Sequence, residues 1–258
     1  MTAVLRLSRL YFLGKVRQQV HLATLFLGVI LFMLPAYVNA FSLGVNAFEK
    51  ISKDFGLTLI HYFGIGLSIL LASSSIPNDI EKRSVYPILA RPLNRSQYIT
   101  AHYLATVAIS AMSFFFLAGC LCLSMSALTK AWELNVFTVV FASFLQAAIV
   151  SAICIAFSTF AGSSLAATLG TVVFLLGSLP GALMRFFLAG KGGSNLMLIV
   201  ATLLKATLPN LSIFALKEPI LSGQALPSNY LGSLSAYAIG WIAFSILFAT
   251  VLFNRRDL

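Results

Sequence analysis

The sequence predicts an all-α polytopic membrane protein with six transmembrane helices. Of its 258 residues, 59% are hydrophobic and only 9% are charged, and the mean hydropathy is +0.95. Soluble domains carry about a quarter charged residues, so a globular fold surrounded by water is excluded. Apolar runs of about 20 residues recur along the chain, and a helix of that length crosses a hydrocarbon core of about 30 Å.

Six apolar runs, separated by short polar segments, predict the membrane spans. We expect the spans at residues 21–40, 57–75, 99–128, 136–160, 165–183 and 231–253. Pro35 is expected to kink the first of them. A Gly162-Ser163-Ser164 break leaves very little chain between the fourth and the fifth. Residues 1–258 therefore form a single transmembrane domain.

The N-terminal residues 1–19 carry four basic side chains and no acidic one: Arg6, Arg9, Lys15 and Arg17. The apolar run that follows is long enough to span and lacks a small-residue cleavage pattern, which argues against a cleaved signal peptide. The three arginines share one broad face of a helical wheel, although Leu13 intrudes on it. We expect an interfacial helix leading into the first span, with a plain basic tail as the alternative.

Residues 184–230, between the fifth and sixth spans, do not fit a simple loop. They include about 13 mostly apolar residues at 196–208, interrupted by Lys205 and ended by Pro209 and Asn210, and this run is too short to cross a membrane. We expect a short re-entrant or interfacial helical region on the extracytoplasmic side.

The net charge is +10, which in a soluble protein would suggest a nucleic-acid partner. Here the basic side chains cluster in the N-terminal tail, in the central segment 76–98 and at the C-terminus. By the positive-inside rule both termini and this segment are cytoplasmic. We therefore expect the Lys and Arg side chains to lie against anionic membrane lipid, with no nucleic acid bound.

Chemistry inside the membrane is poorly supported by the sequence. Ionisable residues at membrane depth are nearly absent, which argues against an ion-coupled carrier. His61 and His102 are expected near span ends with one ring face in water, and a proton relay is the alternative. No Ser/His/Asp set or pair of carboxylates lies at membrane depth, so we expect no enzymatic activity.

Neither a nucleotide site nor a metal site is expected on this chain. Gly190-Lys191-Gly192-Gly193 lacks the earlier glycine and the following Ser or Thr of a phosphate-binding loop. The spacing of Cys120, Cys122 and Cys154 suits neither a disulfide framework nor a thiolate metal site. Any energy for transport must therefore come from another protein.

The central segment 76–98 is the best candidate for receiving that energy. Pro77 lies near the start of a short predicted helix, with acidic residues in its first turn and basic residues after them, an order that suits the helix dipole. Tyr86-Pro87 and Arg91-Pro92 interrupt the helical pattern, and Asn94 with Gln97 resembles a capping box that opens the third span. A partner-docking segment is one interpretation, and a solvated linker is the other.

Three stretches of the chain resemble one family. They are Glu81-Lys82-Arg83-Ser84 with Ile88-Leu89-Ala90-Arg91-Pro92-Leu93-Asn94-Arg95-Ser96-Gln97-Tyr98, the ending Phe253-Asn254-Arg255-Arg256-Asp257-Leu258, and Leu208-Pro209-Asn210-Leu211-Ser212. The resemblance is to type-2 ABC transporter permeases, in the subgroup near the permease for nitrous oxide reductase copper-site maturation. Many relatives have Gly-Lys where this chain has Ala101-His102.

The resemblance implies a membrane subunit of an ATP-driven transporter in the bacterial inner membrane. Two permease copies, as a homodimer or a heterodimer, would pair with two cytoplasmic ABC ATPase subunits that bind ATP and Mg²⁺, while this chain binds no cofactor. A periplasmic accessory protein is a further candidate partner. The few charges in the spans and the 22 Phe residues favour export of a lipid-like or amphipathic substrate.

In this family the segment between the second and third spans is a coupling helix seated in the ATPase. The candidate ATPase-coupling residues are Asp79, Glu81, Lys82, Arg83, Ser84, Tyr86, Leu89, Arg91, Pro92, Arg95 and Tyr98. For Arg95 the alternative role is an anchor to lipid phosphate, and Pro92 is expected to fix the bend. The resemblance also implies an extracytoplasmic gate, with candidate residues Leu204, Leu208, Pro209, Asn210 and Leu211.

Two other functions remain open. The chain could be a membrane scaffold or assembly factor for an envelope enzyme, with no transport of its own. A secondary carrier is the second alternative, and it would require dependence on a proton or sodium gradient.

Overall fold

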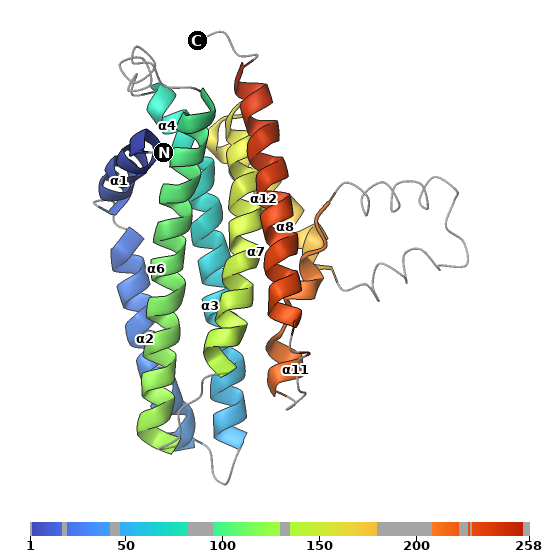
Figure 1. Ribbon diagram of the computed structural model, residues 1–258. Helices are drawn as coiled ribbons and strands as arrows, with labels where there is room; N and C mark the ends of the chain where they lie inside the picture. The colour runs from blue at the N-terminus through green and yellow to red at the C-terminus, as the bar shows by residue number, and fades with distance from the viewer. Residues whose placement is uncertain are drawn as a thin grey trace.

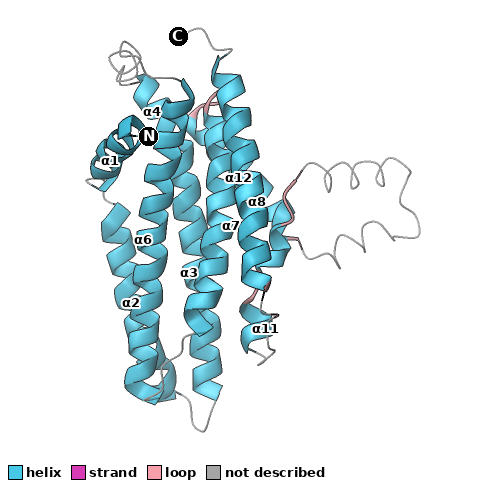
Figure 2. Ribbon diagram, in the orientation of Figure 1, coloured by secondary structure: helices cyan, strands magenta, loops and turns pink. Residues whose placement is uncertain are grey.

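The computed structural model describes residues 2–16, 20–41, 47–81, 95–129, 135–179, 208–221, 227 and 229–254. All regular structure within these ranges is helical, as the sequence predicts (Figure 2). The long helices are α2 (Val20–Phe41), α3 (Ala47–Ser73), α6 (Arg95–Thr129), α7 (Asn135–Ser158) and α12 (Tyr230–Asn254). The shorter elements are α1 (Thr2–Val16), α4 (Ser75–Glu81), α8 (Ser163–Ser178), the 3-10 helix η1 (Leu211–Phe214) and α11 (Lys217–Leu221).

The long helices lie side by side as one elongated bundle (Figure 1). Helices α1 and α4, the start of α6 and the end of α12 share one end of the bundle, which we name the α4 end. The start of α3, the end of α6 and α11 lie toward the opposite end, the α11 end. Segments from the two termini and the centre of the chain therefore meet at the α4 end.

Within the described residues, five helices are long and apolar enough to cross a membrane. They are Leu22–Ala40, Glu49–Glu81, Arg95–Thr129, Asn135–Ser158 and Tyr230–Asn254. The prediction of a multi-pass helical membrane protein is therefore confirmed at this level, and the predicted first, third and sixth spans fall within long helices. The predicted fourth span, 136–160, extends two residues beyond α7, which ends at Ser158. A count of exactly six spans stays a prediction.

The predicted fifth span, 165–183, corresponds to the shorter helix α8. Its 16 residues are about 24 Å long at 1.5 Å per residue, less than a hydrocarbon core of about 30 Å. The helix ends because Leu179 adopts φ −57° and ψ 124°, the extended conformation favoured before a proline such as Pro180. Residues 180–183 lie outside the described ranges.

The second predicted span, 57–75, begins ten residues earlier in the structure, at Ala47. Charged residues at 49–54 had suggested a loop, but Glu49 and Lys53 form an ion pair one helical turn apart. Pairs at this spacing stabilise a helix, so α3 continues through the charged residues. A turn at Ser74 separates α3 from α4.

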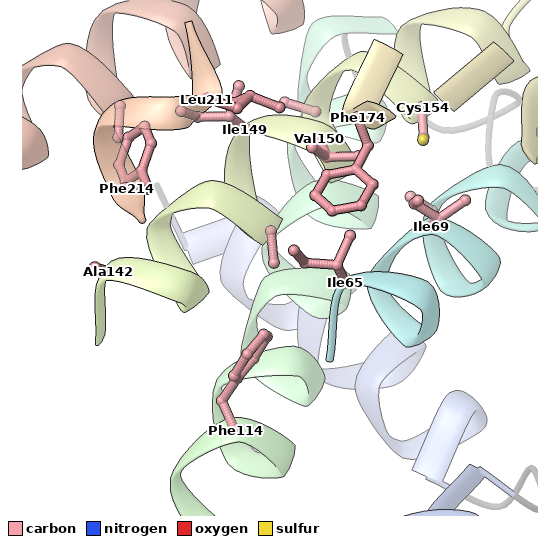
Figure 3. Packing of buried hydrophobic residues seen from close by; sticks show 14 of the residues in the cluster. Ile65, Ile69, Phe114, Ala142, Ile149, Val150, Cys154, Phe174, Leu211 and Phe214 are labelled. Atoms are coloured by element: carbon pink, nitrogen blue, oxygen red, sulfur yellow. The ribbon is translucent and has the colours of Figure 1, made fainter. Parts of the chain in front are cut away.

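Helix α7 forms the centre of the bundle. In its most apolar window 78% of the residues are buried, against 22% for both α2 and α12. Figure 3 shows its Ile149 and Val150 among side chains of α3, α6 and α8. Close packing also depends on Gly64 of α3, where a Cβ atom would lie 2.2 Å from the ring of Phe114. The outer faces of α2 and α12 are left for lipid or another protein.

Candidate functional site

The structure describes only part of the candidate set. Asp79 and Glu81 lie on α4, Arg95 and Tyr98 on the first turns of α6, and residues 208–211 directly before and within η1. Lys82, Arg83, Ser84, Tyr86, Leu89, Arg91, Pro92 and Leu204 lie outside the described residues. The site is therefore built from the two ends of the 76–98 segment.

The first end is α4, which continues directly from α3. Ser74 and Ser75 donate their hydroxyls to the carbonyls of Leu70 and Leu71, one turn earlier on α3. Pro77 is buried in the first turns of α4, where a missing N–H costs nothing. Helix α4 begins at Ser75, two residues before Pro77, which the sequence places near the helix start. It carries Asp79 toward α6.

Asp79 is the centre of a polar group at the α4 end, which we name the Asp79 cluster: Tyr11, Asp79, Tyr98 and His102. The Tyr98 hydroxyl donates to Asp79 Oδ2 at 3.1 Å. His102 Nε2 also lies 3.1 Å from Asp79 Oδ2, and the two side chains are 1% and 17% exposed. A carboxylate this buried needs such partners, because water no longer solvates it.

Tyr11 completes the cluster from α1. Its ring centroid is 3.8 Å from that of His102, with the planes inclined at 33°, and 6.3 Å from that of Tyr98 in an edge arrangement. Burial, followed by the negative charge of Asp79, raises the pKa of the Tyr11 phenol above its ordinary value. The phenol therefore stays protonated, and α1 is joined to α6 by ring contacts at a buried charge.

Arg95 fixes the other end of the segment to α12. One guanidinium nitrogen donates to the carbonyl of Phe253 at 2.9 Å and to that of Asn254 at 3.5 Å. The guanidinium carbon lies 5.7 Å from the Phe253 ring centroid. The last carbonyls of a helix lack helical donors and carry partial negative charge, so Arg95 caps α12. This contact differs from both predicted roles, the partner contact and the lipid anchor.

The ring of Phe253 links Arg95 to the Asp79 cluster. It is fully buried and stacks on Tyr98 with centroids 5.6 Å apart and planes inclined at 16°. The start of α6, the end of α12 and α4 are therefore held in one network of contacts. Helix α6 is described from Arg95 onward, and the predicted capping residue Asn94 lies outside the described residues.

Sequence reasoning missed Tyr11, His102 and Phe253. Arg95, Tyr98 and His102 are three and four residues apart, so they share one face of α6, and this spacing could have identified the histidine. Tyr11 and Phe253 come from the two ends of the chain, and no local pattern connects them to Asp79. The expectation that the His102 ring has one face in water is wrong, since it is 1% exposed.

His61 belongs to a different polar group inside the bundle. Because α3 begins at Ala47, His61 lies well inside the helix and not near its start as expected. Its Nδ1 lies 3.0 Å from Ser143 Oγ on α7. One turn along α7, buried Gln146 donates Nε2 to Ser178 Oγ at 3.3 Å, while its Oε1 has no partner among the described residues.

The described gate candidates are packed against the ends of α8 and α12. Pro209 and Leu211 are buried, and a Cβ atom on Gly177 of α8 would lie 2.8 Å from the Pro209 carbonyl oxygen. The Asn210 backbone N–H donates to the Tyr237 hydroxyl of α12 at 2.8 Å. The Asn210 side chain also caps η1 by accepting from the Ser212 backbone N–H. Residues 208–211 are thus packed against the bundle and held by hydrogen bonds.

Helix α11 ties the same region to α3. Lys217 Nζ lies 2.8 Å from Asp54 Oδ1 and donates to Thr58 Oγ1 at 2.8 Å. The Thr58 hydroxyl in turn donates to the Asp54 carbonyl at 2.6 Å. The chain before α12 is therefore held at the α11 end by a partly exposed ion pair.

Comparison with known proteins adds no assignment. No protein-family model matches the chain, and no curated protein is significantly similar to it. In the part of the chain that the structure describes, no three His, Cys, Asp or Glu side chains converge as a metal site. The function must be argued from the helical membrane architecture and the two ends of the 76–98 segment.

Proposed function

We propose that the chain is the transmembrane permease subunit of an ATP-binding cassette transporter. A separate cytoplasmic ATPase would act on the 76–98 segment, so ATP and Mg²⁺ would bind that partner. The observation that supports this proposal is the attachment of both segment ends to the bundle. Asp79 contacts His102 and Tyr98 of α6, and Arg95 caps α12. Force applied to a segment held in this way reaches the membrane helices, whereas a slack linker would absorb it.

The scarcity of ionisable contacts inside the described part of the bundle also supports an external energy source. The ionisable contacts among the described residues gather at the two ends of the bundle, in the Asp79 cluster and around Asp54. The polar contact of His61, an ionisable ring inside the bundle, is with the Ser143 hydroxyl. A proton or sodium carrier usually needs charged groups along its path. Transport powered by ATP hydrolysis on another chain has no such requirement.

The proposed arrangement follows the positive-inside rule. The α4 end faces the cytoplasm of a bacterial cell, with both termini on that side of the inner membrane. Two permease copies pair across the exposed apolar helices, and an amphipathic or lipid-like substrate leaves between them. Residues 208–211, packed against α8 and α12, form part of the extracytoplasmic gate.

The test is co-purification with an ABC ATPase encoded beside this chain, followed by ATPase assays in lipid nanodiscs. Glu81 is exposed at the end of α4 and is suited to substitution without disturbing the bundle. Glu81→Ala should weaken ATPase binding by about tenfold, or about 1.4 kcal/mol. Lys50→Ala, an exposed change at the α11 end, is the matched control.

Two results would contradict the proposal. The first is that no ATPase is recovered with the wild-type chain from its native membrane, which would favour a scaffold. The second is that Glu81→Ala and Lys50→Ala leave ATPase binding equally strong, which would exclude contact at this end of the segment.

A further inference from the structure

We propose that Tyr11 and His102 are positioning residues that join α1 to α4, so that displacement of the 76–98 segment is passed on to α1. Helix α1 then acts as a lever moved by the segment. This inference deepens the proposed function by adding an element to the moving part. It rests on that function only for the source of the force.

The contacts of α1 separate an attached face from a free face. Leu7 and Tyr11, one turn apart, pack against the main core, and Phe12 packs against a second buried group formed by α3 and α6. Arg9, Leu10 and Leu13 are exposed on the opposite side. A helix free in the membrane interface would bury its apolar face in lipid, whereas α1 directs its aromatic residues at the bundle.

Tyr11 is the α1 residue that reaches the polar network of the segment. Its ring lies 3.8 Å from the His102 ring, and His102 lies 3.1 Å from the Asp79 carboxylate on α4. Asp79 is three residues before residue 82, and the described part of the segment's first end stops at Glu81. A path of direct contacts therefore runs from the segment through Asp79 and His102 to α1.

The chemistry of this path makes it stiff. A buried carboxylate and imidazole at ion-pair distance resist separation, because each would lose its main polar partner in a poorly hydrated site. Aromatic rings in close contact add a preferred geometry. In this arrangement a shift of α4 is passed through the His102 side chain of α6 to the Tyr11 ring of α1.

If Tyr11 only held α1 in place, its contacts in the structure would be the same. The test must therefore detect an effect that passes from one helix to another. We would measure amide hydrogen exchange of the full-length chain in nanodiscs, first without any ATPase. Tyr11→Ala should raise exchange not only in α1 but also in α4, and Asp79→Asn should raise exchange in α1, each by at least about tenfold.

Further variants distinguish the loss of a specific side-chain contact from the loss of side-chain volume. Tyr11→Phe keeps the ring and should keep wild-type exchange in α4. His102→Phe keeps the ring that Tyr11 contacts and should retain the α1 protection that His102→Ala loses. Leu10→Ala, on the free face of α1, is the matched control and should change nothing in α4. If Asp79→Asn disrupts folding, Tyr98→Phe takes its place in the experiment, because this variant removes one hydrogen-bond donor to Asp79.

The experiment is completed with the ATPase and nucleotide present. In the wild-type complex, nucleotide should change exchange in α1 together with the peptides of the 76–98 segment. In Tyr11→Ala the segment should still respond while α1 does not, and substrate transported per ATP should fall at least about threefold.

Either of two findings would overturn the proposal. In the first, Tyr11→Ala and Asp79→Asn each affect only their own helix. In the second, Tyr11→Ala loosens α1 while transport per ATP stays at the wild-type value. The reciprocal effects between α1 and α4 are measured without an ATPase, so their absence would count against this inference alone. Failure of the proposed function would be seen differently, because nucleotide would then change nothing in the wild-type protein.

Discussion

Substituting His102 gives the sharpest measure of the Asp79 cluster. His102→Ala removes the side chain 3.1 Å from the Asp79 carboxylate and the ring on which Tyr11 packs. Asp79 then keeps Tyr98 as a donor but remains largely withdrawn from water. Removing one polar partner of a buried group costs about 1 to 3 kcal/mol, and because the ring contact with Tyr11 is lost as well we expect about 3 kcal/mol.

A double-mutant cycle isolates the pair from the packing around it. Asp79→Asn and His102→Gln are compared singly and together, with unfolding followed by denaturant titration in mixed micelles. The double variant should be less unstable than the sum of the single changes by about 1.5 to 3 kcal/mol. A coupling free energy within about 0.5 kcal/mol of zero would refute the argument that Asp79 and His102 act as one unit.

Three further substitutions test other parts of the bundle. Gln146→Leu removes the amide whose Oε1 lacks a partner among the described residues, so the free energy of unfolding should stay the same or increase by up to about 1 kcal/mol. The thermal midpoint in nanodiscs should therefore stay unchanged or rise. Gly177→Ala places a Cβ atom 2.8 Å from the Pro209 carbonyl oxygen and should cost about 1 to 3 kcal/mol, seen as a lower midpoint, whereas displacement without cost would mean a loosely fitted gate segment. Lys217→Met breaks the ion pair with Asp54, which is partly exposed, so stability should fall by less than about 1 kcal/mol while amide exchange in α11 increases.

Length and hydropathy predicted the membrane helices well because a span is a local property of about 20 residues. The residues at which a span begins and ends depend on interactions outside that apolar run. Helix α3 extends through residues 49–54 because Glu49 and Lys53 pair across one turn, and hydropathy alone counts those side chains as loop. Helix α8 is short because Leu179 is extended before a proline. Both differences arise from side-chain or backbone detail that an apolar run does not contain.

The candidate site was predicted by position more successfully than by contact. Asp79, Arg95 and Tyr98 do lie at the ends of the 76–98 segment, but their described contacts are with the chain's own helices. Charge in a predicted loop suggested a partner, because sequence alone cannot show that α1 and α12 end beside it. Tyr11 became visible only once α1 was placed beside α6, whereas the spacing of His102 from Arg95 and Tyr98 could have identified the histidine from the sequence.

The two ends of the bundle hold their charges in different ways, and this difference has a mechanical consequence. At the α4 end, the Asp79 and His102 side chains are 17% and 1% exposed and are surrounded by packed rings. At the α11 end, the Lys217 and Asp54 side chains are 32% and 53% exposed, where water weakens their attraction. A displacement that entered at the stiff α4 end would be carried along the long helices with little loss. The weaker contacts at the α11 end would separate first, next to residues 208–211. On opening of the proposed gate, we therefore expect the Lys217–Asp54 contact to separate before the Asp79–His102 contact.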